Sequence, residues 1–292
     1  MQAVLEQMRT RVAGAGYIAD DALLTSLWLM KELGRPLLLE GDAGVGKTEV
    51  GKILADMFET KLIRLQCYEG LDVNTAVYEW NYQRQLLAIR RQEILHDDNT
   101  SEQQLFSESY LMKRPLLQSI SEPQPPVLLI DEIDRADEEF EAYLLEVLSD
   151  FQISIPELGT IKASSIPLVV LTSNATRELS DALRRRCLYH YIDYPDYDKE
   201  LRIVLARLPQ TGVNLAAQIV AFVQNLRQQD LRKVPGVAET LEWAAALLRL
   251  DMKSLGDSPD TVVATLGCLL KTREDLDSMP PEIVHRLVAK AS

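Results

Sequence analysis

A glycine-rich stretch near the start of the chain has residue types suited to binding phosphate. Gly41, Gly46, Lys47 and Thr48 match the pattern G-x-x-x-x-G-K-T. In such a loop, backbone N–H groups surround a chain of phosphates, the lysine contacts the outer phosphates and the threonine hydroxyl contacts Mg²⁺. Glycines let the loop curl without Cβ clashes. We therefore predict a triphosphate site that consists of Gly41, Asp42, Ala43, Gly44, Val45, Gly46, Lys47, Thr48 and Glu49.

Two acidic residues follow the most convincing apolar run of the chain. The run 127–130 ends directly before Asp131 and Glu132. In phosphate-loop proteins, an aspartate at the end of such a strand gives Mg²⁺ a second protein contact. The adjacent glutamate can orient and deprotonate an attacking water, as general-base catalysis requires. We therefore predict that Asp131 binds the metal and that Glu132 is the base.

Asn174 is a third polar candidate, because it follows the apolar run 168–171. If this run is the strand beside 127–130, the amide lies near Asp131 and can hold the attacking water. Asparagine is also common in turns. Without the other motifs, a simple turn would be the preferred interpretation.

Regular elements must position these residues, and the sequence predicts a parallel sheet with helices. Apolar runs typical of buried strands lie at 37–39, 62–65, 127–130, 168–171 and 189–192. A helix over 49–58 follows the glycine-rich loop. After residue 195 strand signals stop, and helical periodicity covers 201–208, 215–226, 238–250, 261–270 and 283–289. The predicted fold class is α/β, a P-loop NTPase with a parallel sheet core and a C-terminal all-α lid.

We predict a nucleotide-binding α/β domain over residues 1–193 and a helical lid domain over 194–292. A helix over 134–148 is expected within the first. In the linker before the first strand, Tyr17 and Ile18 can pack against an adenine ring, although packing in the core is the preferred interpretation.

The first domain carries two extra segments. Residues 69–121 are predicted as helices with an inserted exposed element, comprising a helix through Trp80, a polar break at 97–101 and a second helix running to Pro115 or beyond. Trp80 and Tyr82 either hold a partner or pack in the core, and both interpretations stay open. Residues 151–163 alternate at period two around the turn 156–159, which predicts a projecting β-hairpin.

Composition limits the classes of partner and compartment. The net charge of -13 argues against a protein that wraps nucleic acid, because phosphate binding needs a basic surface. Three scattered cysteines fit buried thiols in a reducing cytosol. We see no signal peptide and no apolar run that approaches the roughly 18 residues of a membrane span. A cytoplasmic protein is expected.

The assembled motifs resemble those of the AAA+ ATPases: the loop 41–48, the acidic pair, Asn174, the arginines 184–186 and the helical lid. Within that family the chain resembles the MoxR group, and most of all the CoxD-type proteins encoded with molybdenum-copper hydroxylases. The stronger local matches are Arg35–Gly41, Tyr68–Asp72 with Tyr78–Asn81, and Lys233–Glu239.

The resemblance implies ATP and Mg²⁺ as cofactors and ATP hydrolysis as the activity. Lys47 and Thr48 would bind phosphate and Mg²⁺, Asp131 would bind Mg²⁺, Glu132 would be the base, and Asn174 would polarise the water.

The resemblance also implies roles for two cationic side chains, an arginine finger and a cation of the lid. Arg186 best matches the arginine finger that acts on the adjacent subunit's ATP, and Arg185 is the second choice. Many MoxR proteins have Pro-Arg at the start of a lid helix, where this chain has Gly236 and Val237. Arg232 or Lys233 can substitute, or the lid contacts nucleotide weakly.

At the level of function, the resemblance implies a homo-oligomeric ring, a hexamer, whose ATP cycle remodels another protein. Such rings often work with a protein that bears a von Willebrand A domain. The CoxD-like match suggests a client metalloenzyme, a carbon monoxide dehydrogenase-like enzyme whose metal centre is assembled. The alternative classes are a nucleic-acid-associated AAA+ motor or loader and a small-molecule kinase, and Glu132 suits water activation better than transfer to a metabolite.

Overall fold

The computed structural model describes residues 2–95 and 105–291 of the 292-residue chain. The chain forms two compact units. The helical unit comprises Met1–Asp21, Gly41–Glu49 and Ile192–Ser292, and the sheet unit comprises Ala22–Glu40 and Val50–Tyr191. The glycine-rich loop and the N-terminal segment thus group with the C-terminal helices. The division at residue 193 into a nucleotide-binding domain and a lid stays a prediction.

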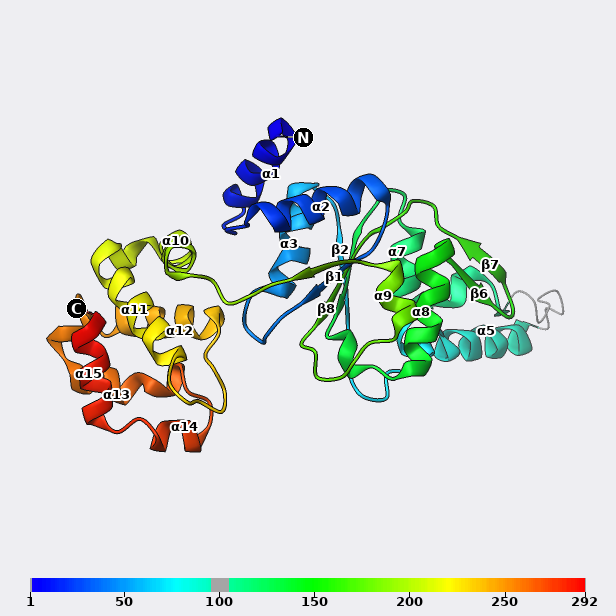
Figure 1. The fold of residues 1–292 in the computed structure, drawn as a ribbon. Coiled ribbons are helices and arrows are strands. Elements are labelled where there is room, and N and C mark those ends of the chain that lie inside the picture. The colour runs from blue at the N-terminus through cyan, green and yellow to red at the C-terminus, as the bar shows by residue number, and fades with distance from the viewer. Residues whose placement is uncertain (1, 96–104, 292) are drawn as a thin grey trace. The chain divides into compact units, whose positions relative to one another are not determined.

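The sheet unit is built on a five-stranded parallel sheet with the strand order β2-β5-β8-β1-β9, as the fold class predicts (Figure 1). Every residue of β1 and β5 is buried, and all but the last residue of each is apolar, whereas β2 at the edge has alternating burial. The bounds are Leu37–Glu40 for β1, Leu62–Gln66 for β2, Val127–Asp131 for β5, Leu168–Ser173 for β8 and Leu188–Tyr191 for β9.

Helices cover both faces of this sheet (Figure 1). One face packs on α2 (Asp21–Leu33) and α3 (Lys47–Met57), and a Cβ built on Gly51 of α3 would lie 3.1 Å from the Leu129 side chain. The other face packs on α7 (Pro115–Ser121), α8 (Glu138–Asp150) and α9 (Asp181–Arg186). The expected helix at 134–148 begins later than predicted, because Asp137 caps α8 and Ile133–Arg135 forms a separate 3-10 turn.

The segment 69–121 differs from its prediction in secondary structure. It contains α4 (Val73–Ala76), β3 (Tyr78–Trp80), α5 (Tyr82–Leu95), a 3-10 turn (Glu108–Tyr110) and β4 (Leu111–Lys113). Trp80 therefore lies in a strand, and Pro115 begins a helix instead of ending one. Helical spacing was misleading here because β3 and β4 pair antiparallel, with Trp80 opposite Leu111. The predicted break at 97–101 lies outside the described residues.

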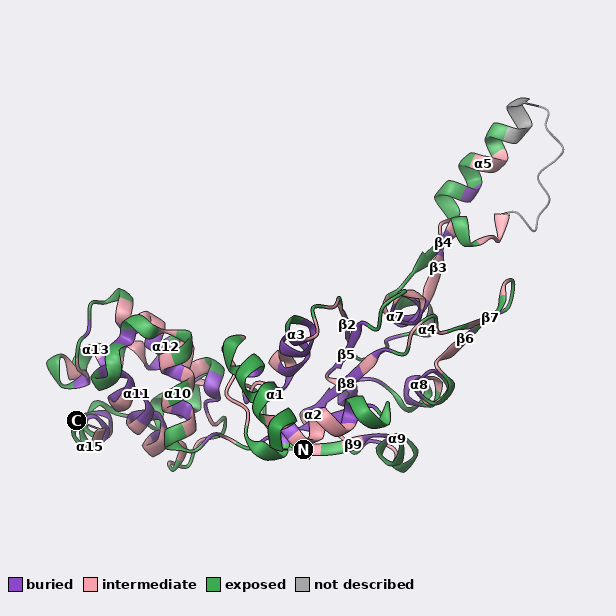
Figure 2. Ribbon diagram, turned by 90° about the horizontal axis from the view of Figure 1, so that it is seen from above, coloured by how far each residue is buried: buried purple, intermediate pink, exposed green. Residues whose placement is uncertain are grey.

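Two elements leave the body of the sheet unit. Helix α5 extends outward and its surface is mostly exposed (Figure 2). The predicted hairpin is confirmed, with β6 (Gln152–Ile155) paired antiparallel to β7 (Gly159–Lys162). Gly159 has a φ of 81°, a left-handed conformation that favours glycine at this turn.

The helical unit has its own core. It contains α1 (Gln2–Gly14), α10 (Tyr197–Arg207), α11 (Gly212–Arg227), α12 (Val237–Arg249), α13 (Pro259–Thr265), α14 (Arg273–Asp277) and α15 (Pro281–Ala291). Short 3-10 turns lie at Pro209–Thr211, Leu255–Asp257 and Leu266–Cys268. Trp243 and Phe222 pack in the centre at a ring distance of 4.9 Å. The helical C-terminal region matches the prediction, except that α14 was not predicted. None of the described helices is long and apolar enough to cross a membrane.

Candidate nucleotide site

The backbone of the glycine-rich loop requires the glycines that the motif supplies. Gly44 and Gly46 have φ values of 80° and 97°, which other residues adopt only with strain. A Cβ on Gly41 would lie 2.2 Å from the carbonyl oxygen of Ile192. The loop therefore has a curled conformation, and α3 begins at Lys47 directly after it. This is the geometry expected of a phosphate cradle.

Lys47 lies inside this cradle. Lys47 is 6% exposed, and its Nζ donates to the carbonyl oxygens of Gly41 and Asp42 at 2.7 and 2.6 Å. The loop therefore holds a buried ammonium group within its own curve, which fits the binding of an anionic phosphate chain.

The start of helix α12 contacts the same loop. Val237 N–H donates to the Gly44 carbonyl at 3.0 Å, and a Cβ on Gly236 would lie 2.9 Å from the Cα of Gly44. The close backbone approach explains the glycine at position 236.

An arginine of the helical unit that the sequence did not identify contacts the residue after the loop motif. Arg207 of α10 donates to the Glu49 carboxylate at 2.9 Å, directly after the glycine-rich motif. The predicted substitutes lie elsewhere: Arg232 pairs with the exposed Glu274, and the Lys233 N–H donates to Asp275. Only its three-dimensional contact identifies Arg207, because it is an ordinary helix-terminal arginine in sequence.

Tyr17 packs on the loop within the helical unit. A Cβ on Gly46 would lie 3.7 Å from Tyr17 Cε2. Burial raises the pKa of the Tyr17 hydroxyl, and the negative charges of Asp20 and Glu49 raise it further. A neutral aromatic ring thus packs beside the glycine-rich loop.

In the sheet unit, Asp131 ends β5 and Glu132 follows it, and a threonine links them. Thr172 of β8 donates from Oγ1 to Asp131 Oδ1 at 2.6 Å, and its oxygen accepts from the Glu132 N–H at 2.9 Å. Glu132 has a φ of 56°, so the backbone turns sharply after the strand. Its carboxylate is one-third exposed and pairs with Arg135 at 3.1 Å. The sequence shows Thr172 only as a strand end.

Asn174 lies at the same edge of the sheet, because β5 and β8 are parallel neighbours and both end there. The residue is partly exposed. A short distance away, Asp134 accepts from the Thr176 N–H and hydroxyl at 3.0 and 2.6 Å. These bonds fix the turn that follows β8 and so restrict the position of Asn174.

Three carboxylates lie near the buried Cys67 at this edge of the sheet. Burial raises the pKa of the Cys67 thiol to about 12, and the charges of Asp131, Asp134 and Glu132 raise it further. Carboxylate oxygens suit Mg²⁺, which uses one or two protein carboxylates together with substrate phosphates. Asp131 is 2% exposed and pairs with Arg64.

The three arginines at the end of α9 have different surroundings. Arg184 pairs with Glu40 at 3.3 Å, and the Tyr189 hydroxyl donates to the same carboxylate. Arg186 donates to Ser149 Oγ at 2.7 Å and to the Ala182 carbonyl at 3.3 Å. Among the described residues, the Arg185 guanidinium has no hydrogen bond or ion pair, and this residue is exposed. Arg185 is therefore the one of the three whose charge is available to another molecule.

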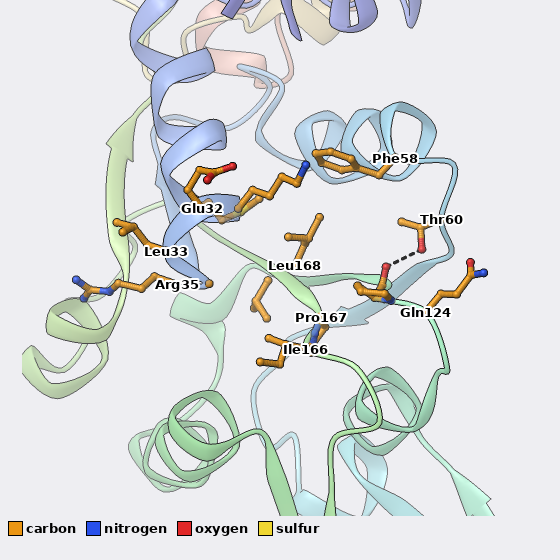
Figure 3. Close-up of a pocket in the computed structure, with 14 residues that line it drawn as sticks. Glu32, Leu33, Arg35, Phe58, Thr60, Gln124, Ile166, Pro167 and Leu168 are labelled. Carbon is orange, nitrogen blue, oxygen red and sulfur yellow. Dashed lines mark hydrogen bonds between the residues drawn. The ribbon is translucent and has the colours of Figure 1, made fainter. Parts of the chain in front are cut away.

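A pocket of about 650 Å³ lies at the opposite edge of the sheet, where the strands begin (Figure 3). Its walls are largely apolar, and Thr60 at its rim donates to the Pro125 carbonyl at 2.7 Å. Arg35, which also lines it, donates to the carbonyl oxygens of Arg185 and Arg186 at 2.6 and 3.2 Å. The pocket wall thereby holds the C-terminus of α9.

Comparison with known proteins identifies a family. The sequence profile of the family described as AAA domain (dynein-related subfamily) matches residues 36–187. An uncharacterized protein of Staphylococcus aureus strain USA300 is 26% identical over 239 residues, which cover 80% of this chain and 82% of that protein. An uncharacterized protein of Staphylococcus epidermidis is 24% identical over 239 residues, with 80% and 81% coverage.

Among solved structures, the Thermotoga maritima RuvB Holliday junction branch migration motor matches with a TM-score of 0.45 and 16% identity. The match covers 90% of this chain and 68% of that one. A point mutant of the same motor gives a TM-score of 0.48 at 18% identity, with 96% and 72% coverage.

Proposed function

Because the chain belongs to the AAA domain family, dynein-related subfamily, we propose that it is an ATPase that binds ATP with Mg²⁺ and hydrolyses it to ADP and phosphate. The observation that carries this proposal is the phosphate cradle of residues 41–49, whose backbone conformation requires its glycines and whose buried Lys47 points into it. A glycine-rich turn without a ligand has no need to bury an ammonium group.

The roles of the individual side chains follow from their chemistry. Lys47 neutralises phosphate charge, and the Thr48 hydroxyl and the Asp131 carboxylate supply oxygen ligands for the metal. When bound, Mg²⁺ neutralises the negative charge that develops on the phosphates. Glu132 accepts a proton from the attacking water, and the Asn174 amide orients that water.

The arginine finger is proposed to be Arg185 in place of the better sequence match, Arg186. A finger must reach charge on a neighbouring subunit, and a guanidinium that is bound within its own chain must first break those bonds. Arg186 is bound to Ser149, and Arg184 is bound to Glu40. The exposed Arg185 meets the requirement.

The proposed assembly is a homo-oligomeric ring, a hexamer, that remodels or matures a partner protein as MoxR proteins do. A metalloenzyme resembling the molybdenum-copper carbon monoxide dehydrogenases is the proposed client, delivered by a protein with a von Willebrand A domain. Exposed apolar side chains on α5 support a protein partner, because Tyr82, Leu86 and Leu87 are 61%, 59% and 67% exposed.

Trp80 does not belong to this partner surface, because its side chain is buried. It is 6% exposed and packs edge-on against Phe106 and Tyr78, at ring distances of 5.2 and 6.2 Å. Of the two interpretations left open by the sequence, the core aromatic is therefore correct for Trp80. The exposed candidate is Tyr82 at the start of α5.

Two variants test the proposed activity. Lys47→Ala is expected to abolish ATP binding, as measured by calorimetry, because it removes the ammonium group from the cradle. Glu132→Gln is expected to bind ATP and nearly stop turnover, because an amide cannot take a proton. ATP affinity of Lys47→Ala close to that of the parent would contradict the proposal. Proteins that co-purify with Glu132→Gln in ATP identify the client.

A further inference from the structure

The carboxylate proposed to bind the metal already has a cationic partner in its own unit. Arg64 of β2 donates to Asp131 Oδ2 from Nε at 3.1 Å and from Nη2 at 2.5 Å. The other carboxylate oxygen, Oδ1, accepts from Thr172 at 2.6 Å. Both oxygens of Asp131 are therefore engaged by protein groups.

The two members of this ion pair differ in their freedom to move. The Asp131 side chain is 3% exposed, whereas that of Arg64 is 48% exposed. The sheet register pairs Gln66 with Asp131 and Arg64 with Leu129, so the arginine side chain runs along its strand toward the carboxyl end. A long side chain with access to solvent can leave this position, but the aspartate is held by the strand and by Thr172.

The guanidinium and a metal ion compete for the same carboxylate. Mg²⁺ needs direct contact with carboxylate oxygen, and like charges placed on one oxygen repel each other. We propose that Arg64 is an internal counter-ion that holds Asp131 in the metal-free state and is displaced when Mg²⁺ and nucleotide bind. This inference rests on the proposed function. It makes Arg64 a positioning residue that raises the Mg²⁺ concentration needed for tight nucleotide binding.

Two other roles for Arg64 give different results. A purely structural ion pair stays in place in every state, so its removal changes stability and leaves the Mg²⁺ dependence unchanged. A guanidinium that moves onto the nucleotide phosphates contributes to binding even without metal. Nucleotide binding measured with and without Mg²⁺ therefore separates all three roles.

The experiment measures the affinity of a fluorescent ADP for the full chain across a Mg²⁺ titration, with EDTA as the metal-free point. Arg64→Gln is expected to lower the Mg²⁺ midpoint by roughly tenfold, as loss of a charged hydrogen-bonding competitor implies, and to leave the affinity in EDTA unchanged. Arg64→Lys keeps the charge but loses the planar fork, and a shift of roughly threefold is expected.

Arg114→Gln is the matched control. It removes an arginine of similar exposure, 43%, from an ion pair with Glu79 in the segment 69–121, and is expected to leave the midpoint unchanged. Circular dichroism checks that each variant folds. If Arg64→Gln does not fold, the Mg²⁺ midpoint of Arg64→Lys alone is compared with that of the parent.

An unchanged midpoint in the folded Arg64 variants overturns the inference, as does a weaker affinity in EDTA, which would place Arg64 on the phosphates. If the ADP affinity of the parent protein does not depend on Mg²⁺, the result contradicts the proposed function itself.

Discussion

A single hydroxyl group forms hydrogen bonds with both acidic residues at the carboxyl ends of the strands. Thr172 donates to the Asp131 carboxylate and accepts from the Glu132 backbone N–H. Glu132 has a left-handed conformation, and this bond helps to hold the turn that carries the proposed base. The sequence predicts the acidic pair from its motif, but the linking residue lies about forty positions away and only the strand pairing brings it close.

Thr172→Val should show what this hydroxyl contributes. Valine keeps the shape but leaves buried polar groups without a partner, so we expect the free energy of unfolding to fall by about 1–3 kcal/mol. Turnover should fall while ATP affinity, measured by calorimetry, stays near that of the parent. Thr172→Ser keeps the hydroxyl and is the control. Equal turnover in both variants would remove Thr172 from the mechanism.

The second prediction at this scale separates two neighbouring arginines. Arg185→Ala should bind ATP normally but hydrolyse it more slowly by about 10³-fold or more, the range seen for arginine fingers in GTPases. Arg186→Ala should slow hydrolysis far less, because its guanidinium is bound to Ser149. Steady-state turnover of the two purified variants decides between them. A larger defect in Arg186→Ala would restore the assignment that the sequence favours.

At the scale of elements, predictability depends on whether local pattern and tertiary pairing agree. The strands β1, β5 and β8 each begin with an unbroken apolar run of three or four residues, and their prediction is confirmed. Around Trp80, by contrast, helical spacing competes with a strand pairing to Leu111 that is distant in sequence, and the pairing prevails. The loop conformation is predictable from its glycines, whereas the backbone contact between the loop and Gly236 is not, because it depends on the packing of two segments that are distant in sequence.

The contact between Gly236 and the glycine-rich loop supports a prediction about the start of α12. In Gly236→Ala, the new methyl group would lie 2.9 Å from backbone atoms of the loop, so the loop or α12 must shift. Overpacking of this kind costs about 1–3 kcal/mol, and we expect weaker ATP binding by calorimetry. Gly267→Ala is the control, because a Cβ there meets nothing within 4 Å. Similar affinity in both variants would show that this approach does not matter for nucleotide.

The hairpin gives a prediction about the partner. Its inner residues Ile153 and Ile155 are buried, while Pro156 and Glu157 at the turn are exposed. Replacing Pro156 and Glu157 by glycine and serine should spare basal ATPase activity but impair client activation. The measurement is the metal content of the proposed molybdenum hydroxylase in cells that carry the variant. Unchanged metal content with a folded, expressed variant would show that the hairpin does not contact the client.

At the scale of the whole molecule, the chain has a net charge of -13 but carries exposed basic residues on α9 and α5. An arginine that is free on one copy and a phosphate cradle on another are complementary surfaces, and such head-to-tail contacts close into rings when the rotation permits. The family match supports the ATPase, while the ring and its client depend on the MoxR-like motifs.

A mixing experiment tests whether two copies share one site. Lys47→Ala and Arg185→Ala should each be inactive alone. In an equal mixture, roughly a quarter of head-to-tail interfaces combine an intact cradle with an intact Arg185, so turnover should rise to about that fraction of the parent's. Mixing Lys47→Ala with Glu132→Gln is the control and should restore nothing, because no site then has both a bound ATP and a base. If native mass spectrometry shows mixed assemblies and the first pair still lacks turnover, the finger does not act between copies. If no assembly larger than one copy forms with ATP, the ring itself is wrong, and Arg185 must serve another partner.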